Sequence, residues 1–233
     1  MDQIAFPLAD EPSMLPLIAS GAALPAPPEL PVQTATRRRP KPGERRAQIL
    51  EALAAMLESP GTERVTTAAL AGKLGVSEAA LYRHFASKAQ MFESLLDFIE
   101  QSIFSLINQI TAKYADPHTQ VRLIVGTLVQ FAEKNRGLTR VMVGDALVWE
   151  NERLQQRMNL LFDKVEATIK QCLREAALVD GAVGPAVPAA VAAGVLVGFL
   201  MGRLQRFARS GFRRLPSDQL EATLRYLLVG DWR

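Results

Sequence analysis

The stretch Val65–Phe85, VTTAALAGKLGVSEAALYRHF, decides the fold of this 233-residue chain. Thr66 is suited to cap a helix, because its hydroxyl can accept a hydrogen bond from a free amide of the first turn. Gly75 stands where that helix must end, since glycine adopts a left-handed backbone without steric strain. Ser77 can cap a second short helix, in which Leu81 points back to the core. Two short helices joined by a three-residue glycine turn predict a helix-turn-helix.

The second of these helices carries residue types that suit the major groove of DNA. With Leu81 turned inward, Ala79 and Arg83 project outward, and Ala80 and Tyr82 lie on the flanks. Small side chains let a helix lie deep in the groove, where an arginine can read a guanine edge or hold a phosphate. The residues expected to contact DNA are Thr66, Thr67, Ser77, Ala79, Ala80, Tyr82, Arg83, His84, Lys88, Arg45 and Arg46.

Several residues of this segment have more than one interpretation. Tyr82 could belong mostly to the core. His84 fits a phosphate contact or a surface position better than catalysis, since no carboxylate or nucleophile stands near it in sequence. Glu78 could repel phosphate, support the cap at Ser77 or accept a hydrogen bond from a cytosine amine. Lys88, at the start of the next helix, is expected to clamp a phosphate beside free helix-end amides.

The charge of the chain is unevenly distributed. The formal net charge is +3, yet residues 1–36 hold four acids and no lysine or arginine, whereas residues 37–92 hold ten basic and five acidic residues. The basic excess includes the run RRRPK at residues 37–41 and coincides with the helix-turn-helix. It is the electrostatic pattern expected of a polyanion partner, although a solvated basic face would give the same counts.

Composition argues against several other classes of protein. Cys172 is the only cysteine, so no internal disulfide can form, and together with His84 and His118 it provides too few ligands for a thiolate or imidazole zinc site. The sequence contains no phosphate-binding glycine loop or nucleophile elbow, and its N-terminus lacks a secretory pattern. We therefore expect a cytoplasmic protein that is not an enzyme and uses no metal or cofactor.

Apolar residues recur at the helical period from Glu44 onward, which predicts an all-α chain. Residues 1–43 hold nine of the 14 prolines and are expected to form a disordered leader with a basic end. Residues 44–92 form the predicted DNA-binding domain, and residues 93–233 a helical dimerisation and partner-binding domain. Besides the two short helices, the expected helices are Glu44–Glu58, Ser87–Ile110, Pro117–Asn135, Val143–Ala177, Pro188–Gly211 and Ser217–Leu228, with a turn at Arg136-Gly137.

One uncharged stretch, Ala182–Gly202, is long enough to span a bilayer. Two prolines near its start and its many alanines and glycines disfavour insertion, so we expect a buried helix and no membrane partner. Gly194, Gly198 and Gly202 recur every four residues and give this helix one smooth face. Such a face permits the close approach of another helix, either from a second subunit or within the domain.

The stretch Thr66–Lys88 resembles the DNA-binding segment of the TetR family, in which a capped helix is followed by Gly-Val-Ser, an aromatic Leu-Tyr…Phe pattern and Ser-Lys. This resemblance implies a three-helix N-terminal domain and a larger helical domain that dimerises through its last two long helices. Gly194, Gly198 and Gly202 would then lie in the dimer interface. Most members of the family are repressors released by a small ligand, and this remains the alternative function.

Segments beyond the helix-turn-helix narrow the resemblance to the nucleoid occlusion factors of this family. They include NRGLTR at residues 135–140 and FARSGF at residues 207–212, and the similarity covers about Arg45 to Leu228. It implies a nucleoid-associated homodimer that binds palindromic double-stranded DNA, with one or several dimers per site. When bound to DNA, such a protein antagonises polymers of the division GTPase FtsZ and blocks septum assembly over the chromosome.

The same resemblance implies a surface for FtsZ on the helices that follow the DNA-binding domain. Phe98 and Asn135 match the residues found at the corresponding positions of the family's FtsZ surface. Lys134 differs from the residue found at a third position but preserves its charge. Phe98 could equally be a core aromatic residue, and Asn135 could simply end its helix. The positions that depart from the pattern are Leu106, Thr127 and Gln130.

Overall fold

The structure is a computed structural model that describes residues 43–59, 65–148, 150–179 and 187–229. All regular elements within these ranges are helical, so the predicted all-α fold is confirmed. The elements are α1 (Glu44–Glu58), α2 (Thr67–Leu74), α3 (Glu78–Tyr82), α4 (Lys88–Lys113), α5 (Pro117–Lys134), α6 (Arg136–Met142), the short 3-10 helix η1 (Asp145–Leu147), α7 (Glu152–Val179), α8 (Ala189–Arg209) and α9 (Leu220–Val229).

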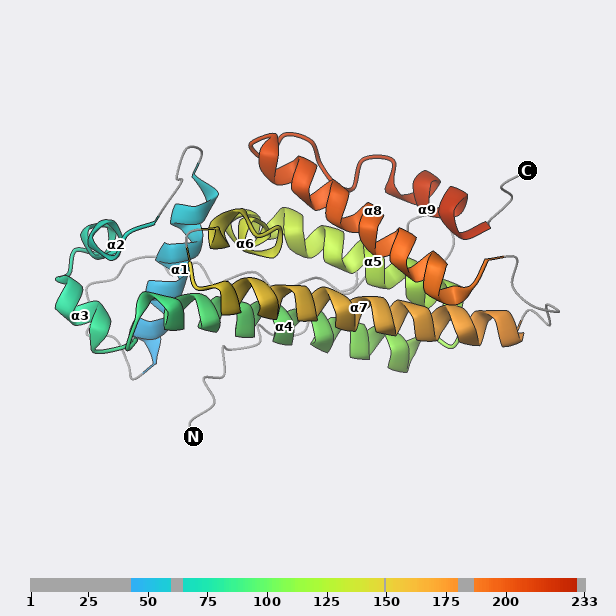
Figure 1. Ribbon diagram of the computed structural model, residues 1–233, viewed down its shortest axis with the longest axis horizontal. Helices are drawn as coiled ribbons and strands as arrows, with labels where there is room; N and C mark the ends of the chain where they lie inside the picture. The colour runs from blue at the N-terminus through green and yellow to red at the C-terminus, as the bar shows by residue number, and fades with distance from the viewer. Residues whose placement is uncertain (1–42, 60–64, 149, 180–186, 230–233) are drawn as a thin grey trace.

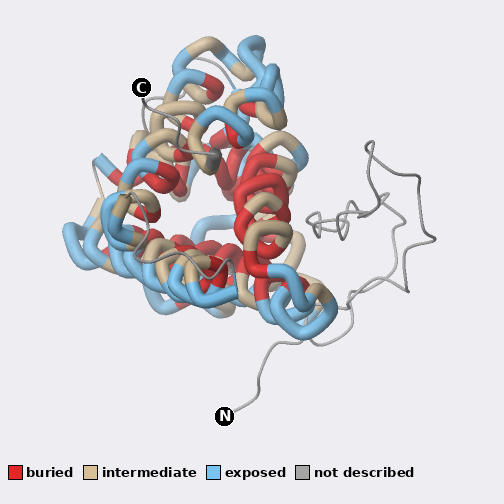
Figure 2. Tube along the Cα trace, turned by 90° about the vertical axis from the view of Figure 1, so that its right-hand side faces the viewer, coloured by how far each residue is buried: buried red, intermediate tan, exposed pale blue. Residues whose placement is uncertain are grey.

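A small unit of three helices, α1 to α3, lies at one end of a longer helical body (Figure 1). Helix α4 starts beside α3 and runs along the body next to α7, while α5 packs against both and α8 crosses over α5 and α7. Buried residues gather where the helices face one another (Figure 2). They form one continuous core that joins the two parts and includes Leu53, Leu81, Phe92, Ile124, Phe131 and Leu200.

Side-chain caps fix where several helices begin. An oxygen of the cap residue accepts a hydrogen bond from the backbone amide three residues later, at 2.8–3.3 Å, which satisfies a donor that the first turn leaves free. Gly75 ends α2 with a φ of 65°, the left-handed conformation that was predicted for it. The caps that follow this pattern are Thr66, Ser77, Ser87 and Asp116.

The helix predicted over Val143–Ala177 is wrong at its beginning. The chain first forms α6, and Gly144, with a φ of 84°, then leads into η1 before α7 begins at Glu152. The predicted turn at Arg136-Gly137 is also wrong, because both residues belong to α6. Apolar periodicity continues through this region, so it could not reveal the break. The remaining predicted helices agree with the observed ones to within three residues at each end.

Helix α8 begins after Pro188 and buries one face, which includes Ala193, Leu196 and Leu200. The prediction of a buried helix therefore holds for that face of the single chain. By length and composition alone α8 could cross a membrane, and 33% of its most apolar window is buried within the single chain. One such helix is weak evidence for a membrane span, because core helices of soluble proteins pass the same criteria.

The predicted domain boundaries remain predictions. Residues 1–42 of the expected leader lie outside the described residues. The expected division between residues 92 and 93 falls inside α4, a continuous helix that belongs to both parts of the molecule.

Candidate nucleic-acid interface

The helix-turn-helix is built from α2, the turn at Gly75 and α3. Thr66 accepts a hydrogen bond from the Ala69 amide at 3.1 Å, and Ser77 accepts one from the Ala80 amide at 3.3 Å. The amide of Gly75 donates to the Gly72 carbonyl at 3.1 Å, which closes the end of α2. Because both helices start at a capped residue, the three-residue turn sets the direction in which α3 leaves α2.

The outer side of α3 is open to solvent. Ala79 and Arg83 are exposed, Tyr82 is 46% exposed, and Ala80 and His84 are half-buried. Leu81 on the inner side is fully buried. The exposure of Tyr82 argues against its interpretation as a core residue. The geometry thus presents small and cationic side chains outward, while their contact with DNA stays a prediction.

Three of the predicted DNA contacts have side chains that bind partners at least 11 residues away along the chain. Arg46 donates from Nη1 to the carbonyl oxygen of His84, and its guanidinium carbon lies 4.2 Å from the centre of the Phe85 ring. The Thr67 hydroxyl donates to Glu78, and Lys88 pairs with Glu150. Sequence reasoning did not predict these partners, because each lies at least 11 residues away along the chain.

Each of these contacts joins two different elements. Arg46 ties the start of α1 to the end of α3, and the Thr67–Glu78 bond of 2.6 Å ties the first residue of α2 to the first residue of α3. Glu78 therefore supports the geometry of the helix pair through α2 rather than through the cap at Ser77. Arg45, by contrast, donates to Gln48 of its own helix at 3.0 Å.

The three residues matched to an FtsZ surface differ in exposure. Phe98 and Asn135 are 7% and 6% exposed, whereas Lys134 is exposed. The side-chain amide of Asn135 donates to the Phe131 carbonyl at 2.9 Å, so Asn135 does end α5. Thr127, one of the departing positions, is fully buried, and its hydroxyl has no hydrogen-bond partner. Of the three matched residues, Lys134 alone is therefore exposed to solvent.

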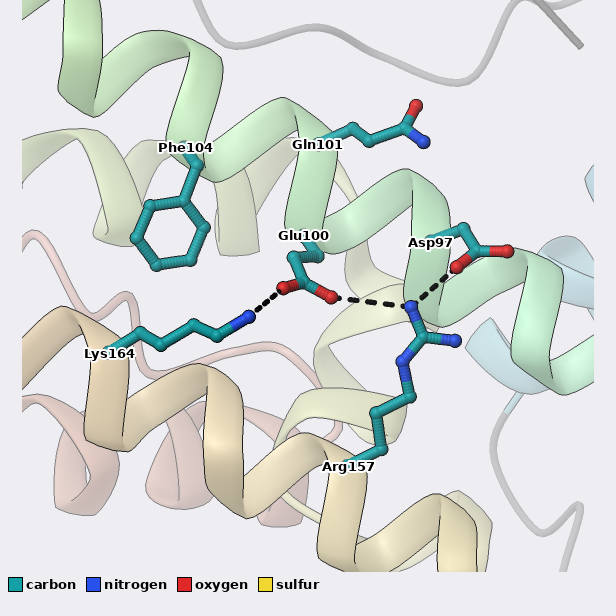
Figure 3. A pocket seen from close by; sticks show the side chains of 6 residues that line it. All are labelled: Asp97, Glu100, Gln101, Phe104, Arg157 and Lys164. Atoms are coloured by element: carbon teal, nitrogen blue, oxygen red, sulfur yellow. Dashed lines mark hydrogen bonds and ion pairs between the residues drawn. The ribbon is translucent and has the colours of Figure 1, made fainter. Parts of the chain in front are cut away.

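A series of ion pairs joins α4 to α7 along a cleft of about 420 Å³ (Figure 3). Arg157 lies between Asp97 at 2.5 Å and Glu100 at 3.3 Å, and Lys164 reaches Glu100 at 2.5 Å. Hydrogen bonds from Lys164 and then Arg157 lower the pKa of Glu100 against the opposing effect of burial. Because these charges already neutralise one another, the cleft fixes α4 against α7 rather than providing a free binding site.

The glycine face predicted for dimerisation is open in the single chain. A Cβ at Gly198 or Gly202 would meet nothing within 4 Å, and one at Gly194 would meet only a Glu166 oxygen, at 3.7 Å. Val191 and Val195, which are 53% and 46% exposed, lie on the same side of α8. The described residues of α8 thus carry an exposed apolar strip of small side chains.

Comparison with known families agrees with this arrangement. The family described as "Bacterial regulatory proteins, tetR family" matches residues 49–95, and the SlmA-like family described as "Tetracyclin repressor-like, C-terminal domain" matches residues 115–229. The protein named nucleoid occlusion factor SlmA from Alteromonas mediterranea is 49% identical over 179 residues, which is 77% of this chain and 91% of the relative. The chain belongs to the TetR family, in its SlmA-like group.

Further members of the group show the same coverage. The SlmA proteins of Vibrio vulnificus and Escherichia coli O1:K1 are 50% and 47% identical over 78% and 82% of this chain, and 92% and 93% of their own lengths. Among solved TetR-family folds, the regulator PfmR from Thermus thermophilus aligns with a TM-score of 0.63 at 23% identity, covering 80% of this chain and all of its own. The fatty acid degradation regulator FadR from Bacillus halodurans aligns with a TM-score of 0.66 at 15% identity, covering 84% and 100%. These two likenesses concern the fold alone.

Proposed function

We propose that this protein is a nucleoid occlusion factor: a homodimer that binds palindromic DNA and, when bound, antagonises FtsZ polymers so that no septum assembles over the chromosome. The observation that carries the proposal is the extent of the similarity to the SlmA proteins. About half of the residues are identical over roughly nine-tenths of each relative, so the likeness is not limited to the helix-turn-helix that the TetR family shares.

The proposed DNA contact is made by the exposed side of α3. Arg83 would reach a base edge, Ala79 and Ala80 would allow a close approach, and Tyr82 would meet a phosphate. The further contacts proposed are Thr66, Ser77, His84, Lys88 and Arg45. Thr67 and Arg46, whose side chains are engaged within the domain, would act mainly by positioning α3.

The proposed dimer forms through α8 and α9. The strip made by Val191, Val195, Gly194, Gly198 and Gly202 would pack against its symmetry mate, because small side chains allow two helix backbones to approach closely. A two-fold axis would then present two α3 helices to half-sites about one helical turn apart. This geometry accounts for a palindromic site.

The proposed FtsZ surface is centred on Lys134, the exposed cation at the end of α5. Phe98 and Asn135 would support this surface from inside the protein, because both side chains are almost fully buried. The proposal assigns no catalytic role and no cofactor to the chain, and it locates the protein in the cytoplasm on the nucleoid.

The experiment that tests this function measures GTP-assembled FtsZ by light scattering and sedimentation. Sites are first obtained by mapping bound chromosomal DNA, and the full-length protein is then added with and without a duplex of one such site. Loss of polymer that requires both protein and duplex supports the proposal, and Lys134→Glu should weaken this effect without weakening DNA binding. Polymers indifferent to the protein–DNA complex would contradict it. A single bound operator beside the protein's own gene, released by a metabolite, would instead identify a ligand-controlled repressor.

A further inference from the structure

Lys88, the first residue of α4, is already bound to an anionic group of the protein. Its ammonium pairs with the Glu150 carboxylate, which lies between η1 and α7. The two side chains are only 18% and 10% exposed, and the Lys88 nitrogen lies 5.6 Å from the centre of the Phe92 ring. A phosphate that binds Lys88 must therefore take the place of Glu150.

Lys88 lies at the DNA-facing end of the molecule. Helix α4 starts beside the end of α3, and Ser87 caps it by accepting from the Gln90 amide at 3.1 Å (Figure 1). The start of a helix carries a partial positive charge, which favours an anion next to Lys88. A DNA phosphate and the Glu150 carboxylate would thus compete for one cation.

The polarity of this pair differs from the other ion pairs between α4 and the α7 region. Arg157 pairs with Asp97 and Glu100, and Lys164 pairs with Glu100 (Figure 3). Arg153 pairs with Glu93, so in each of these pairs the acid belongs to α4. Among these ion pairs of the described residues, Lys88–Glu150 alone has its cation on α4. DNA is a polyanion, so it can take the place of an acid but not of a cation. Lys88–Glu150 is thus the one pair of this set in which DNA bound to α4 could replace the partner that comes from the α7 region.

We propose that Lys88 exchanges Glu150 for a DNA phosphate, and that this exchange transmits DNA occupancy from α4 to the start of α7. Once Lys88 has left, a carboxylate that is 10% exposed has lost its cation, and such a group must move towards water or find another partner. Residues 150–155, which lead into α7, would rearrange as a result. This inference rests on the proposed DNA binding and supplies a route by which DNA could alter the partner-binding domain.

The exchange makes Glu150 an internal competitor of DNA. Removing its charge should tighten DNA binding by about three- to tenfold, as expected for two directly coupled groups. This gain should depend on Lys88, because Glu150 acts through that side chain. The number of phosphates contacted should not change, so the salt dependence of binding should stay the same.

The test uses the full-length protein and a fluorescein-labelled duplex of random sequence, with affinity measured by anisotropy at several KCl concentrations. We expect Glu150→Gln to bind more tightly with an unchanged salt slope, and Lys88→Gln to bind more weakly with a slope lower by about one unit. In the Lys88→Gln background, Glu150→Gln should give no further gain. Glu152→Gln is the matched control, because Glu152 is an exposed acid two residues away whose carboxylate accepts from Gln156 at 3.3 Å.

The possible results separate the two proposals. Equal gains from Glu150→Gln and Glu152→Gln would mean a general charge effect, and a gain that persists without Lys88 would likewise overturn the exchange. Wild-type protein that fails to bind the duplex at low salt would overturn the DNA-binding function as well. Glu150→Ala provides the same comparison should the glutamine variant unfold at a lower temperature than the wild type.

Hydrogen exchange of the backbone amides tests the transmission itself. Duplex binding should increase exchange in residues 150–155 of the wild type while it protects α3, and Glu150→Gln should show the increase without DNA. Unchanged exchange in this segment, measured with a saturating amount of duplex, would overturn transmission through the start of α7.

Discussion

Gly137 of α6 packs directly on the backbone of Ala54 in α1. A Cβ added at Gly137 would lie 2.0 Å from the Ala54 carbonyl oxygen, a distance at which one of the helices must shift. Arg140, one turn further along α6, donates to the Leu57 carbonyl at 3.3 Å. The close contact of α1 with α6 therefore joins the helix-turn-helix unit to the larger domain, and it requires a residue without a side chain.

Gly137→Ala should destabilise the protein and alter the position of the helix-turn-helix unit. The collision is with backbone rather than with a flexible side chain, so relief requires α1 and α6 to separate, at a cost of about 1–3 kcal/mol. Thermal unfolding followed by circular dichroism measures the loss, and duplex binding should weaken in parallel.

Gly72→Ala is the matched control for this substitution. Gly72 also lies within a helix, but a Cβ there meets nothing within 4 Å, so alanine should stabilise α2 by up to about 1 kcal/mol through its higher helix propensity. If both variants unfolded at the same temperature, the α1–α6 contact would not be as close as described.

The same glycine shows why part of the fold could not be predicted from the sequence. The helix boundaries that depend on local chemistry, such as the caps at Thr66 and Ser77 and the left-handed Gly75, were predicted correctly. Gly137 was interpreted as a turn because local sequence cannot distinguish a glycine needed for backbone freedom from one needed for close packing. That distinction depends on Ala54, which is far away in the chain.

Glu78→Gln should strengthen DNA binding. The substitution removes a negative charge from the outer surface of the helix-turn-helix, while the amide oxygen can still accept the hydrogen bond from Thr67. For an exposed charge, the gain should be about 0.2–1 kcal/mol, or roughly 1.4- to fivefold in affinity. Duplex binding measured by anisotropy at low salt provides the comparison.

Thr67→Val separates the positioning role of this bond from the charge effect. It leaves the charge of Glu78 in place but removes the donor that links α2 to α3, so affinity for DNA should fall. Equal affinities for Thr67→Val and the wild type would show that the bond does not position α3.

Gly198→Leu should dissociate the proposed dimer while leaving the folded subunit intact. The position is exposed, with open space around it, and leucine favours a helix over glycine by about 1 kcal/mol. Sedimentation velocity should therefore show more monomer, whereas helix content stays the same. Gly72→Leu, another helical glycine in open space, should leave the dimer unaffected, and a dimer that tolerates leucine at position 198 would argue for a different interface.

The partners of the candidate DNA contacts were beyond sequence reasoning for a physical reason. Lys88 is 62 residues from Glu150, and Arg46 is 38 residues from His84, so these contacts exist only after the helices have packed. Exposure on α3 follows from helical periodicity and was predictable, as the outward Ala79 and Arg83 show. Which of the cations already have a partner within the protein depends on the tertiary fold.

Acid should weaken the α4–α7 contact at Glu100. Hydrogen bonds from Lys164 and Arg157 hold the pKa of this carboxyl below its ordinary value of 4.5. A lowered folded-state pKa stabilises the protein above that ordinary value, and this stabilisation is lost as the pH falls through the folded-state pKa. The Glu100→Gln variant should therefore be less stable than the wild type at pH 7, by about 0.2–1 kcal/mol for each of the ion pairs with Arg157 and Lys164 that it loses. This difference in the free energy of unfolding should shrink below about pH 4.5. A constant difference in urea unfolding between pH 7 and strongly acidic conditions would contradict this assignment.

Arg83→Ala should reduce the preference for the specific site more than it reduces general DNA binding. Arg83 is exposed on the outer side of α3, and a guanine contact from such a position contributes about 1–3 kcal/mol of discrimination. Tyr82→Phe removes a hydroxyl from a neighbouring exposed side chain that is proposed to meet a phosphate, so it should weaken specific and random duplexes alike. The two variants are compared by the ratio of their affinities for a mapped site and a random duplex. If both change this ratio equally, base readout does not lie with Arg83, and the orientation of α3 in the groove must differ from the one proposed.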